Sequence, residues 1–288
     1  MKIAFDFGFG WTKVCVDTPT GIQCIKFPSW LAYHSNSSIS EVDKVVFDGK
    51  EYVVGFDAKY ERQKITITSM RELLNYFPLF KKYALTRLGI NEHDIEQIIT
   101  GIPPSQKQHA SILEAQNIKV VPQGVGIYLD TISRSNFEDV EDILVIDIGY
   151  NTVDYLLVTV KDSKKKKGNS IEKMGVERMI ELFRDKLPDE ISYIKQLSLQ
   201  RLMEIFEKGY VNLEGEKINL SNYKNKAIDE YNEILKTRLY DEIKNLIDEV
   251  ELLTLAGGGA YYIDNIRKAG VFVPEEPEFS QARGYLLL

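Results

Sequence analysis

Short apolar segments separated by glycine turns open the chain, in the pattern of β-strands. The apolar run Ile3–Phe5 breaks at Asp6–Gly10 and resumes through Thr12–Val16. A further run, Ile22–Phe27, follows a turn at Gly21. Tight glycine breaks between β-rich runs are typical of hairpins. We therefore expect three consecutive strands in a meander at the N-terminus.

A polar stretch then interrupts this pattern before helices begin. Residues 29 to about 69 contain a strand pair joined by Asp48-Gly49, which indicates an inserted subdomain. Met70–Leu88 carries apolar residues at helical spacing, with Pro78 at a kink and Gly89 as a cap. Strand and helix patterns then alternate, with strands at Ile95–Thr100 and Ile118–Val121 and helices at about Pro103–Ala115 and Gln123–Ile132.

The second half of the chain begins like the first, with three strand patterns in a row. Helical patterns, a glycine-rich loop and further strands complete it. The expected strands are Ile143–Ile148, Val153–Val160, Ser170–Lys173, Leu252–Leu255 and Val271–Val273; the expected helical regions are Val176 to about Lys208 and Ser221 to about Glu249, with a hairpin near Leu213–Glu216 and another helix after the glycines.

An internal repeat is the most informative feature of the sequence. Ile3–Phe9 and Leu144–Tyr150 both spell three apolar residues, Asp, apolar, Gly, aromatic. Each copy opens a half that starts with three strands. The repeat predicts two duplicated lobes related by pseudo-symmetry across a cleft.

The repeated turns carry candidate phosphate chemistry. Glycine lets the backbone pass close to a ligand and expose its N–H groups. Asp6 and Asp147 would then face each other and hold Mg²⁺ through its waters, while Lys13 would neutralise phosphate charge. For either hairpin alone, a turn-forming aspartate without chemistry is an equally good interpretation; the pair favours a binding site.

Gly257, Gly258 and Gly259 follow an apolar strand and precede a helix pattern, which forms a candidate nucleotide platform. The loop lacks the Lys-Ser/Thr of a P-loop and the spacing of a dinucleotide fingerprint. For His34, His93 and His109 we expect structural roles, because they fall in a polar insertion, a helix start and a surface helix.

Composition narrows the class of protein. The 288 residues are 44% hydrophobic and 27% charged, with a net charge of -7, so we expect globular lobes and no broad grip on nucleic acid. Cys15 and Cys24 are expected as buried thiols in a reducing, cytoplasmic setting. The N-terminus lacks a signal-like pattern and no apolar run reaches membrane-spanning length, so a soluble protein is expected. Lys164–Lys167 is expected at a solvated hairpin tip.

Three motifs together resemble a known superfamily, that of actin, the sugar kinases and the chaperone ATPases. Asp6–Lys13 resembles its first phosphate motif, Asp147–Asp154 its second, and Ala256–Ala260 its adenosine motif. Within the superfamily, the ParM/StbA type of plasmid-segregation actin is most similar. The supporting segments are Phe47–Gly55, Thr100–Pro103, Val121–Gly126 and Pro277–Tyr285.

The resemblance implies a duplicated, two-lobed α/β fold of the actin-like (ribonuclease H-like) kind. Lobe I would comprise residues 1–141 and a C-terminal helix at about 275–288, with the inserted subdomain at about 29–69. Lobe II would comprise residues 142–274, with a helical subdomain at about 185–249.

The resemblance also implies the ligands, ATP and Mg²⁺, and the residues that bind them. Asp6 and Asp147 would coordinate the metal through water and take part in catalysis, and Gln123 would position the hydrolytic water. Phe9 departs from actin, which has a hydroxyl there, so only backbone donors or Thr12 could replace that contact, and Asp154 could act behind the metal site. The nucleotide-binding positions would be Gly8, Phe9, Gly10, Trp11, Thr12, Lys13, Gly149, Tyr150, Asn151, Thr152, Gly257, Gly258, Gly259 and Ala260.

The function implied is an ATPase that polymerises into nucleotide-regulated filaments for plasmid or DNA segregation. Its partners would be identical subunits and a DNA-bound adaptor protein, with no direct nucleic-acid or membrane contact. Two alternatives stay open on the same fold: a small-molecule kinase of the sugar-kinase type, and a shape-determining cytoskeletal actin homologue.

Overall fold

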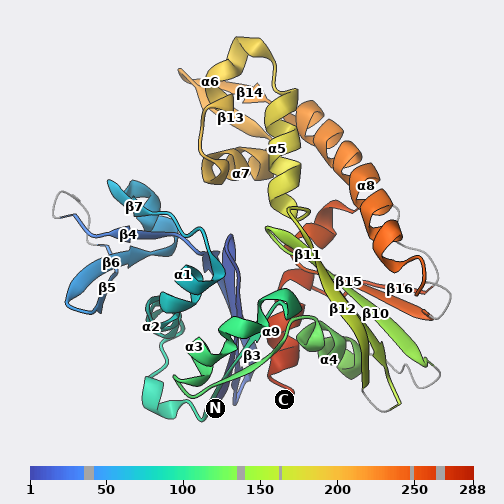
Figure 1. The fold of residues 1–288 in the computed structure, drawn as a ribbon. Coiled ribbons are helices and arrows are strands. Elements are labelled where there is room, and N and C mark those ends of the chain that lie inside the picture. Colours follow the sequence, from blue (N-terminus) through green and yellow to red (C-terminus); the bar gives the residue numbers. More distant parts are fainter. Residues whose placement is uncertain (36–41, 135–139, 162–163, 247–249, 264–269) are drawn as a thin grey trace.

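Two five-stranded sheets with the same strand order form the framework of the molecule (Figure 1). The computed structural model describes residues 1–35, 42–134, 140–161, 164–246, 250–263 and 270–288. The first sheet has the order β3-β2-β1-β8-β9 and the second β12-β11-β10-β15-β16. The strands of the first are β1 (Lys2–Phe7), β2 (Trp11–Thr18), β3 (Gly21–Pro28), β8 (Gln97–Ile102) and β9 (Ile118–Pro122); those of the second are β10 (Asp142–Ile148), β11 (Thr152–Thr159), β12 (Lys164–Glu172), β15 (Leu252–Ala256) and β16 (Val271–Phe272).

The two sheets also agree in strand direction. In each, the first three strands pair antiparallel, the fourth pairs parallel with the strand that carries the motif aspartate, and the fifth pairs parallel with the fourth. Asp6 pairs with Lys13 across the first hairpin, and Asp147 pairs with Asp154 across the second. The duplication expected from the sequence repeat is confirmed, and so is the two-lobed fold.

The inserted subdomain is a separate small sheet beside the first lobe. Its order is β5-β6-β4-β7, and a 3₁₀-helix, η1 (Gly55–Tyr60), follows β6. The helix pattern expected over Met70–Leu88 forms two helices, α1 (Met70–Asn75) and α2 (Phe77–Leu88), broken before Pro78. The insert strands are β4 (Leu31–Tyr33), β5 (Lys44–Phe47), β6 (Lys50–Val54) and β7 (Gln63–Ile65).

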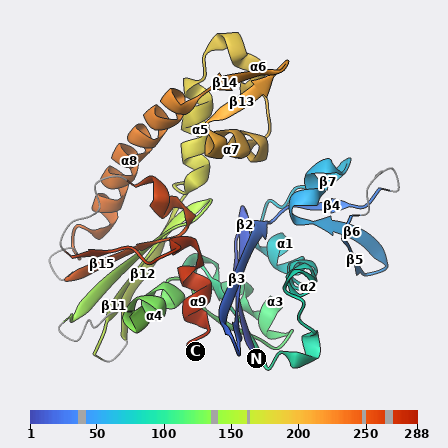
Figure 2. The ribbon, with the colours of Figure 1, turned by 180° about the vertical axis from the view of Figure 1, so that it is seen from behind.

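Helices between β12 and β15 build a second subdomain above the second sheet (Figure 2). They share one apolar core with that sheet, in which Phe183, Phe206 and Tyr231 are fully buried. The elements are α5 (Val176–Lys186), η4 (Asp189–Ile191), α6 (Ser192–Lys195), α7 (Leu199–Lys208), the hairpin β13 (Tyr210–Leu213) and β14 (Glu216–Asn219), and α8 (Ser221–Ile243).

Two helices cross where the lobes meet. α4 (Val125–Arg134) packs on the second sheet, whereas α9 (Ser280–Tyr285), next to the C-terminus, packs on the first. They touch at Gly126 and Gly284, where a Cβ on Gly284 would lie 1.7 Å from the Gly126 carbonyl oxygen. The buried Arg283–Asp130 ion pair, 3.1 Å long, ties the same two helices together. The remaining helical elements are η2 (Glu92–Asp94), η3 (Pro104–His109), α3 (Ala110–Glu114), η6 (Gly258–Tyr262) and η7 (Pro277–Phe279).

Several sequence expectations need correction. Cys15 and Cys24, expected as buried thiols, face each other across β2 and β3 and form a disulfide. The Lys164–Lys167 run lies within β12, not at a hairpin tip, and pairs with the end of β11 around an irregularity between Leu157 and Val158. Gln123 precedes α4, which begins at Val125. The helix expected after the glycine loop and the end of the one near Glu249 fall partly outside the described residues.

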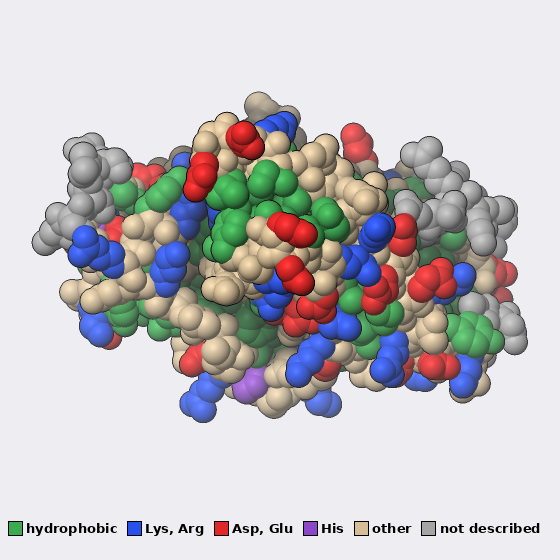
Figure 3. All heavy atoms as spheres, turned by 90° about the horizontal axis from the view of Figure 1, so that it is seen from above, with side chains coloured by type: hydrophobic (Ala, Val, Ile, Leu, Met, Phe, Trp, Pro, Cys, Tyr) green, Lys and Arg blue, Asp and Glu red, His purple; other side chains and the backbone are tan. Residues whose placement is uncertain are grey.

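Acidic and basic side chains are interspersed over the face seen in Figure 3, where they surround a central group of hydrophobic side chains. None of the helices within the described ranges has the length and apolar character needed to cross a bilayer.

Candidate functional site

A cavity of about 640 Å³ lies between the two lobes, with both repeated hairpins in its wall. Most of the residues that the sequence singled out line it. Those in the wall are Asp6, Gly8, Phe9, Trp11, Lys13, Gln123, Asp147, Gly149, Tyr150, Asn151, Thr152 and Gly258. Gly10, Thr12, Gly257, Gly259 and Ala260 are not among the residues that line it. Both copies of the repeat therefore contribute to the wall of one cavity.

The first hairpin presents an ion pair to the cavity. Lys13 Nζ donates to Asp6 Oδ2 at 2.7 Å. Burial on its own would lower the pKa of Lys13, but the adjacent Asp6 carboxylate outweighs it and raises that pKa. Lys13 is thus held as a cation at the place where the sequence predicted phosphate contact.

The turn of the first hairpin is fixed from behind by Ser29, a residue that the sequence did not single out. Ser29 donates through its backbone to the Gly10 carbonyl at 3.0 Å and through its hydroxyl to the Gly8 carbonyl at 2.6 Å. Thr12 shares a hydrogen bond with the Ser29 hydroxyl and is fully buried. The idea that Thr12 replaces the contact missing at Phe9 is therefore wrong, since its hydroxyl points into the lobe.

The second hairpin has the same turn geometry with a different charge. Gly149 N donates to Thr152 O at 3.0 Å, as Gly8 N does to Trp11 O at 3.2 Å. Asp154 stands opposite Asp147 and accepts hydrogen bonds from Thr152 and from Ser170 on β12.

Two acidic side chains in the second hairpin have strongly perturbed protonation. Burial, with the nearby charges of Asp6 and Asp154, raises the pKa of Asp147 to about 8. Burial likewise raises the pKa of Asp154 to about 6, although its hydrogen bonds from Ser170 and Thr152 oppose the rise. Perturbed carboxylates that gather in a cavity are characteristic of functional sites.

The donor set fits Mg²⁺ bound mainly through water. Asp6 and Asp147 are 7% and 8% exposed and face the same cavity. Their mutual repulsion would be relieved by a divalent cation, and Mg²⁺ commonly takes one or two carboxylates and keeps its waters. No cluster of three or more potential metal-ligating side chains occurs in the part of the chain that the structure describes.

The two hairpins touch each other. A Cβ on Gly10 would lie 2.5 Å from the Tyr150 ring, so that glycine is required for the ring to pack there. Trp11, from the first lobe, packs against the core of the second. Residues 149–151 are also held by backbone hydrogen bonds from the first residues of α5. The facing loops are thus preorganised on both sides.

The triple glycine adjoins the second hairpin. Gly257 has φ +84°, and a Cβ there would lie 2.3 Å from Asp147 Oδ1. Gly259 packs on Ile148 in the same way, whereas Gly258 faces open space in the cavity wall. Ala260 is buried in the lobe core. Gly257 and Gly259 thus leave room for Asp147 and Ile148, and Gly258 brings its backbone to the cavity wall.

Gln123 lies at the end of β9, in the cavity wall. Its backbone N–H donates to Ile102 O at 3.0 Å, and Gly124 follows with φ +86°. Its side chain can therefore reach into the cavity from the first lobe.

One end of the cavity has an apolar wall that the sequence motifs did not reveal. Met203, Phe206 and Glu207 come from α7, and Tyr262 and Val176 stand beside them. Lys26 Nζ pairs with Glu278 Oε1 at 2.9 Å on the facing side. The amphipathic pattern of α7 shows in the sequence that one face of the helix is apolar. The pattern does not show whether that face packs in a core or lines a cavity.

The other end is polar and includes Thr68, Arg71, Gln106 and His109. His109 was expected on a surface helix with a structural role; it ends η3 and lines the cavity.

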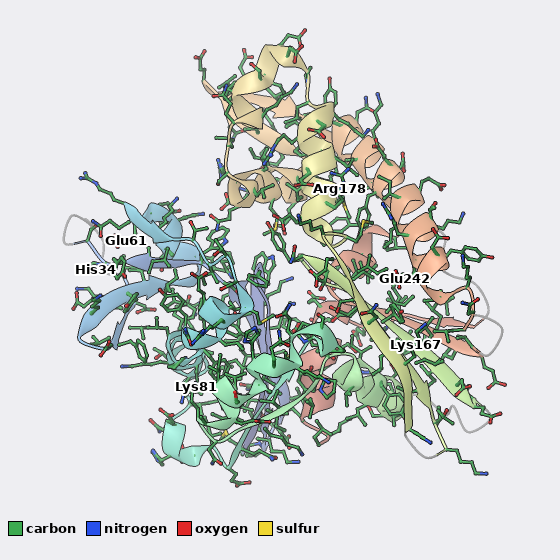
Figure 4. All side chains as sticks on the ribbon, viewed as in Figure 1. His34, Glu61, Lys81, Lys167, Arg178 and Glu242 are labelled. Carbon is green, nitrogen blue, oxygen red and sulfur yellow. A yellow bond between two sulfur atoms is a disulfide. The ribbon has the colours of Figure 1, made fainter. Side chains whose placement is uncertain are left out.

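The insert and the helical subdomain are joined by an ion pair. Lys59, on η1, pairs with Glu204, on α7, at 3.4 Å. Phe56, also on η1, packs edge-on against Trp11 with ring centroids 5.9 Å apart. At the end of η1, Glu61 is held by His34 at 3.1 Å, and Figure 4 shows this pair within the insert. Trp11 lines the cavity, and Glu204 lies on α7 next to the lining residue Met203, so η1 contacts elements from both lobes that contribute to the cavity wall.

A duplicated two-lobed fold with phosphate-type hairpins facing across a cleft defines the actin superfamily class. Comparison with family models supports that assignment: residues 4–116 match the N-terminal domain of actin-like proteins, and residues 145–268 match the C-terminal domain of archaeal MreB-like actin homologues. The chain belongs to the actin-like proteins.

Solved structures agree over the whole length. Ta0583, an archaeal actin homologue, has a TM-score of 0.79 at 19% identity and covers 99% of this chain and 97% of its own. A ParM filament from Clostridium botulinum has a TM-score of 0.77 at 21% identity, with 99% and 97% coverage. Bacillus thuringiensis ParM with ATP has 0.67 at 17%, with 98% and 96% coverage. The fold is thus that of the ParM type. No curated protein matches the chain.

Proposed function

We propose that this protein binds ATP with Mg²⁺ in the cleft between its lobes, hydrolyses it, and polymerises into filaments whose stability depends on the nucleotide. The observation that carries the proposal is the pair of aspartate hairpins facing one cavity, with Lys13 beside Asp6 and a raised pKa at Asp147. Ta0583 with bound ADP and Bacillus thuringiensis ParM with ATP support nucleotide as the ligand.

The roles of the residues follow from their places. Backbone N–H groups of the two turns would hold phosphate oxygens, and Lys13 would stabilise charge on the outer phosphates. Asp6 and Asp147 would hold the metal through its waters, and the bound metal would neutralise phosphate charge during transfer. The apolar end, with Phe206 and Tyr262, suits the nucleoside.

Gln123 would orient the attacking water. An amide accepts and donates hydrogen bonds without removing a proton, so it can align water while leaving the reaction slow. The attacking water must lose a proton during hydrolysis. Asp154, which has a pKa of about 6 and lies on the strand next to that of Asp147, would accept this proton.

Assembly completes the proposal. The filament from Clostridium botulinum supports self-association, and identical subunits are the partner we propose. A role in segregating plasmid or other DNA would need a DNA-bound adaptor, which fits the net charge of -7 better than direct DNA contact does. We also propose a cytoplasmic location, although the Cys15–Cys24 disulfide is more typical of oxidising compartments.

Sedimentation with ATP, ADP and no nucleotide, alongside a phosphate-release assay, tests the proposal. We expect ATP-dependent pelleting followed by phosphate release and loss of polymer. Pelleting that ignores nucleotide would contradict the filament function. Transfer of phosphate to an added sugar, without polymer, would instead establish the kinase alternative.

A further inference from the structure

Tyr285, on α9, places a buried hydroxyl group near Gln123, which lines the cavity. The side chain is fully buried, and no described residue forms a hydrogen bond with its hydroxyl. The polar atom lies against Gly101, where a Cβ would come within 1.7 Å of it. Gly126 makes room for the other edge of the ring, since a Cβ there would lie 2.9 Å from Tyr285 Cδ1. Gly101 thus leaves room for the Tyr285 hydroxyl, whereas Gly126 leaves room for the Gln281 carbonyl oxygen, 2.1 Å from such a Cβ, as well as for the ring.

The hydroxyl is close to Gln123. A Cβ built on Gly101 would lie 1.7 Å from the Tyr285 hydroxyl oxygen and 3.2 Å from Gln123 Cγ. The hydroxyl oxygen and Gln123 Cγ are therefore at most about 5 Å apart. A rotation of the Gln123 side chain, or one water between them, would connect the two groups. The hydroxyl therefore lies near the residue for which we propose water positioning.

The backbone beside Gln123 is held by the same helix. Gln281 Oε1 accepts hydrogen bonds from Gly124 N and Ile127 N, each at 3.2 Å. Gln281 and Tyr285 stand one turn apart on α9, so both can face this segment. Gln281 Nε2 is a second buried donor to which no described residue is hydrogen-bonded.

Packing alone does not explain a tyrosine here. Phenylalanine would fill the same space without burying an unpaired hydroxyl, which is unfavourable in a protein interior. Burial, reinforced by the charges of Asp6, Asp147 and Asp154, raises the pKa of Tyr285 well above its ordinary value. The hydroxyl stays protonated and available as a donor, within electrostatic reach of the site.

We propose that Tyr285 is a positioning residue for ATP hydrolysis: its hydroxyl donates to the Gln123 side chain, directly or through one water, and orients the amide towards the attacking water. This inference rests on the proposed ATPase function. Through Tyr285, α9 would then contribute directly to hydrolysis, although the helix packs on the first sheet and crosses α4.

Phosphate release by Tyr285→Phe protein tests the inference under single-turnover and steady-state conditions. We expect kcat to fall about tenfold, as for loss of one hydrogen bond in the transition state, with KM for ATP nearly unchanged. Thermal stability of the nucleotide-free protein should stay equal or rise, because no described residue bonds the buried hydroxyl in the absence of nucleotide.

Tyr231→Phe is the matched control. Its hydroxyl is also buried but donates to Met174 O at 2.8 Å in the core of the second lobe, away from the cavity wall. That variant should lose thermal stability and keep its kcat, the opposite pattern.

A double-mutant cycle decides whether Tyr285 acts through Gln123. The double variant Gln123→Ala with Tyr285→Phe should be no slower than Gln123→Ala alone. A full additional tenfold loss, or unchanged kcat in Tyr285→Phe, would overturn the inference while leaving ATPase function intact. Absence of hydrolysis in the unaltered protein would overturn both.

Discussion

Lys13 and Asp154 occupy equivalent positions in the two halves of the molecule, each directly opposite the motif aspartate of its hairpin. The repeat keeps the aspartate and changes its partner from a cation to an anion. Asp6 is therefore neutralised by a 2.7 Å ion pair, whereas Asp147 is buried beside a second carboxylate. Asp147 consequently keeps its proton to a higher pH than an ordinary aspartate, and a bound metal would favour its ionised form.

Replacing Asp147 with its neutral amide should affect stability and activity in opposite directions. In Asp147→Asn, ATP hydrolysis should fall by roughly 100-fold or more, because metal coordination is lost. Without ligands at pH 8, the same variant should be more stable than the unaltered protein, on the order of 1–3 kcal/mol. Thermal unfolding at pH 8 and pH 5 checks this, since the gain should shrink at pH 5, where Asp147 is already protonated. Equal destabilisation at both pH values would contradict it.

Stability without ligands should decline with rising pH. The pKa of Asp147 is about 8 in the folded protein against an ordinary value of 3.8, so the folded state holds this proton more tightly. The stabilisation is complete below the ordinary value and is lost as pH rises towards about 8. Adding ATP with Mg²⁺ should raise the melting temperature more at pH 8 than at pH 6, because binding needs the ionised carboxylate. Melting scans across this pH range, with EDTA as the control, measure it.

Adjacent glycines in the triple-glycine loop should differ sharply. Gly257→Ala combines a left-handed backbone with a Cβ 2.3 Å from Asp147 Oδ1, so we expect a loss of roughly 2–4 kcal/mol and impaired nucleotide binding. Gly258→Ala, which meets open space, should fold with little loss and serves as the control. Urea unfolding of both variants decides the matter, and similar stability for the two would refute this role of Gly257.

The ion pair between the insert and the helical subdomain should slow nucleotide release. Lys59→Ala removes the contact between η1 and Glu204, and we expect ATP to dissociate about two- to fivefold faster, consistent with the modest energy of a partly exposed pair. Arg201→Ala is the control, because Arg201 also pairs with Glu204 but lies on the same helix. Stopped-flow release at low and high salt measures both. If the control releases ATP as fast as Lys59→Ala, the contact between the walls is irrelevant.

The disulfide should be measurable and stabilising. Protein purified without reductant should show no free thiols, and Cys15→Ala with Cys24→Ala should lower stability by about 2–3 kcal/mol, the value for closing a loop of this length. Thiol titration in denaturant and unfolding with and without reductant test this. Two free thiols in the unreduced protein would refute the bridge and agree with the reducing setting expected from the sequence.

Much of the site could be predicted because each turn is determined by a few residues that are adjacent in the sequence. A strand that ends in aspartate and turns over glycine positions its own backbone, so Asp6, Gly8, Asp147 and Gly149 were identified from a few neighbouring residues. Their duplication predicted the two sheets and the cleft, since each half repeats one order of strands. The helix break before Pro78 followed in the same way from the chemistry of proline.

Only the tertiary structure decided which distant side chains complete the site. Ser29 fixes the first turn, α7 supplies the apolar wall, and Tyr285 reaches beneath Gln123 from the far end of the chain. Lys13 and Asp154 were visible as residues, but their opposite electrostatic effects depend on burial and on neighbours from other strands. Hydrophobic periodicity shows that a face is buried and not what it is buried against, so long-range packing and the resulting pKa shifts could not be read from the sequence.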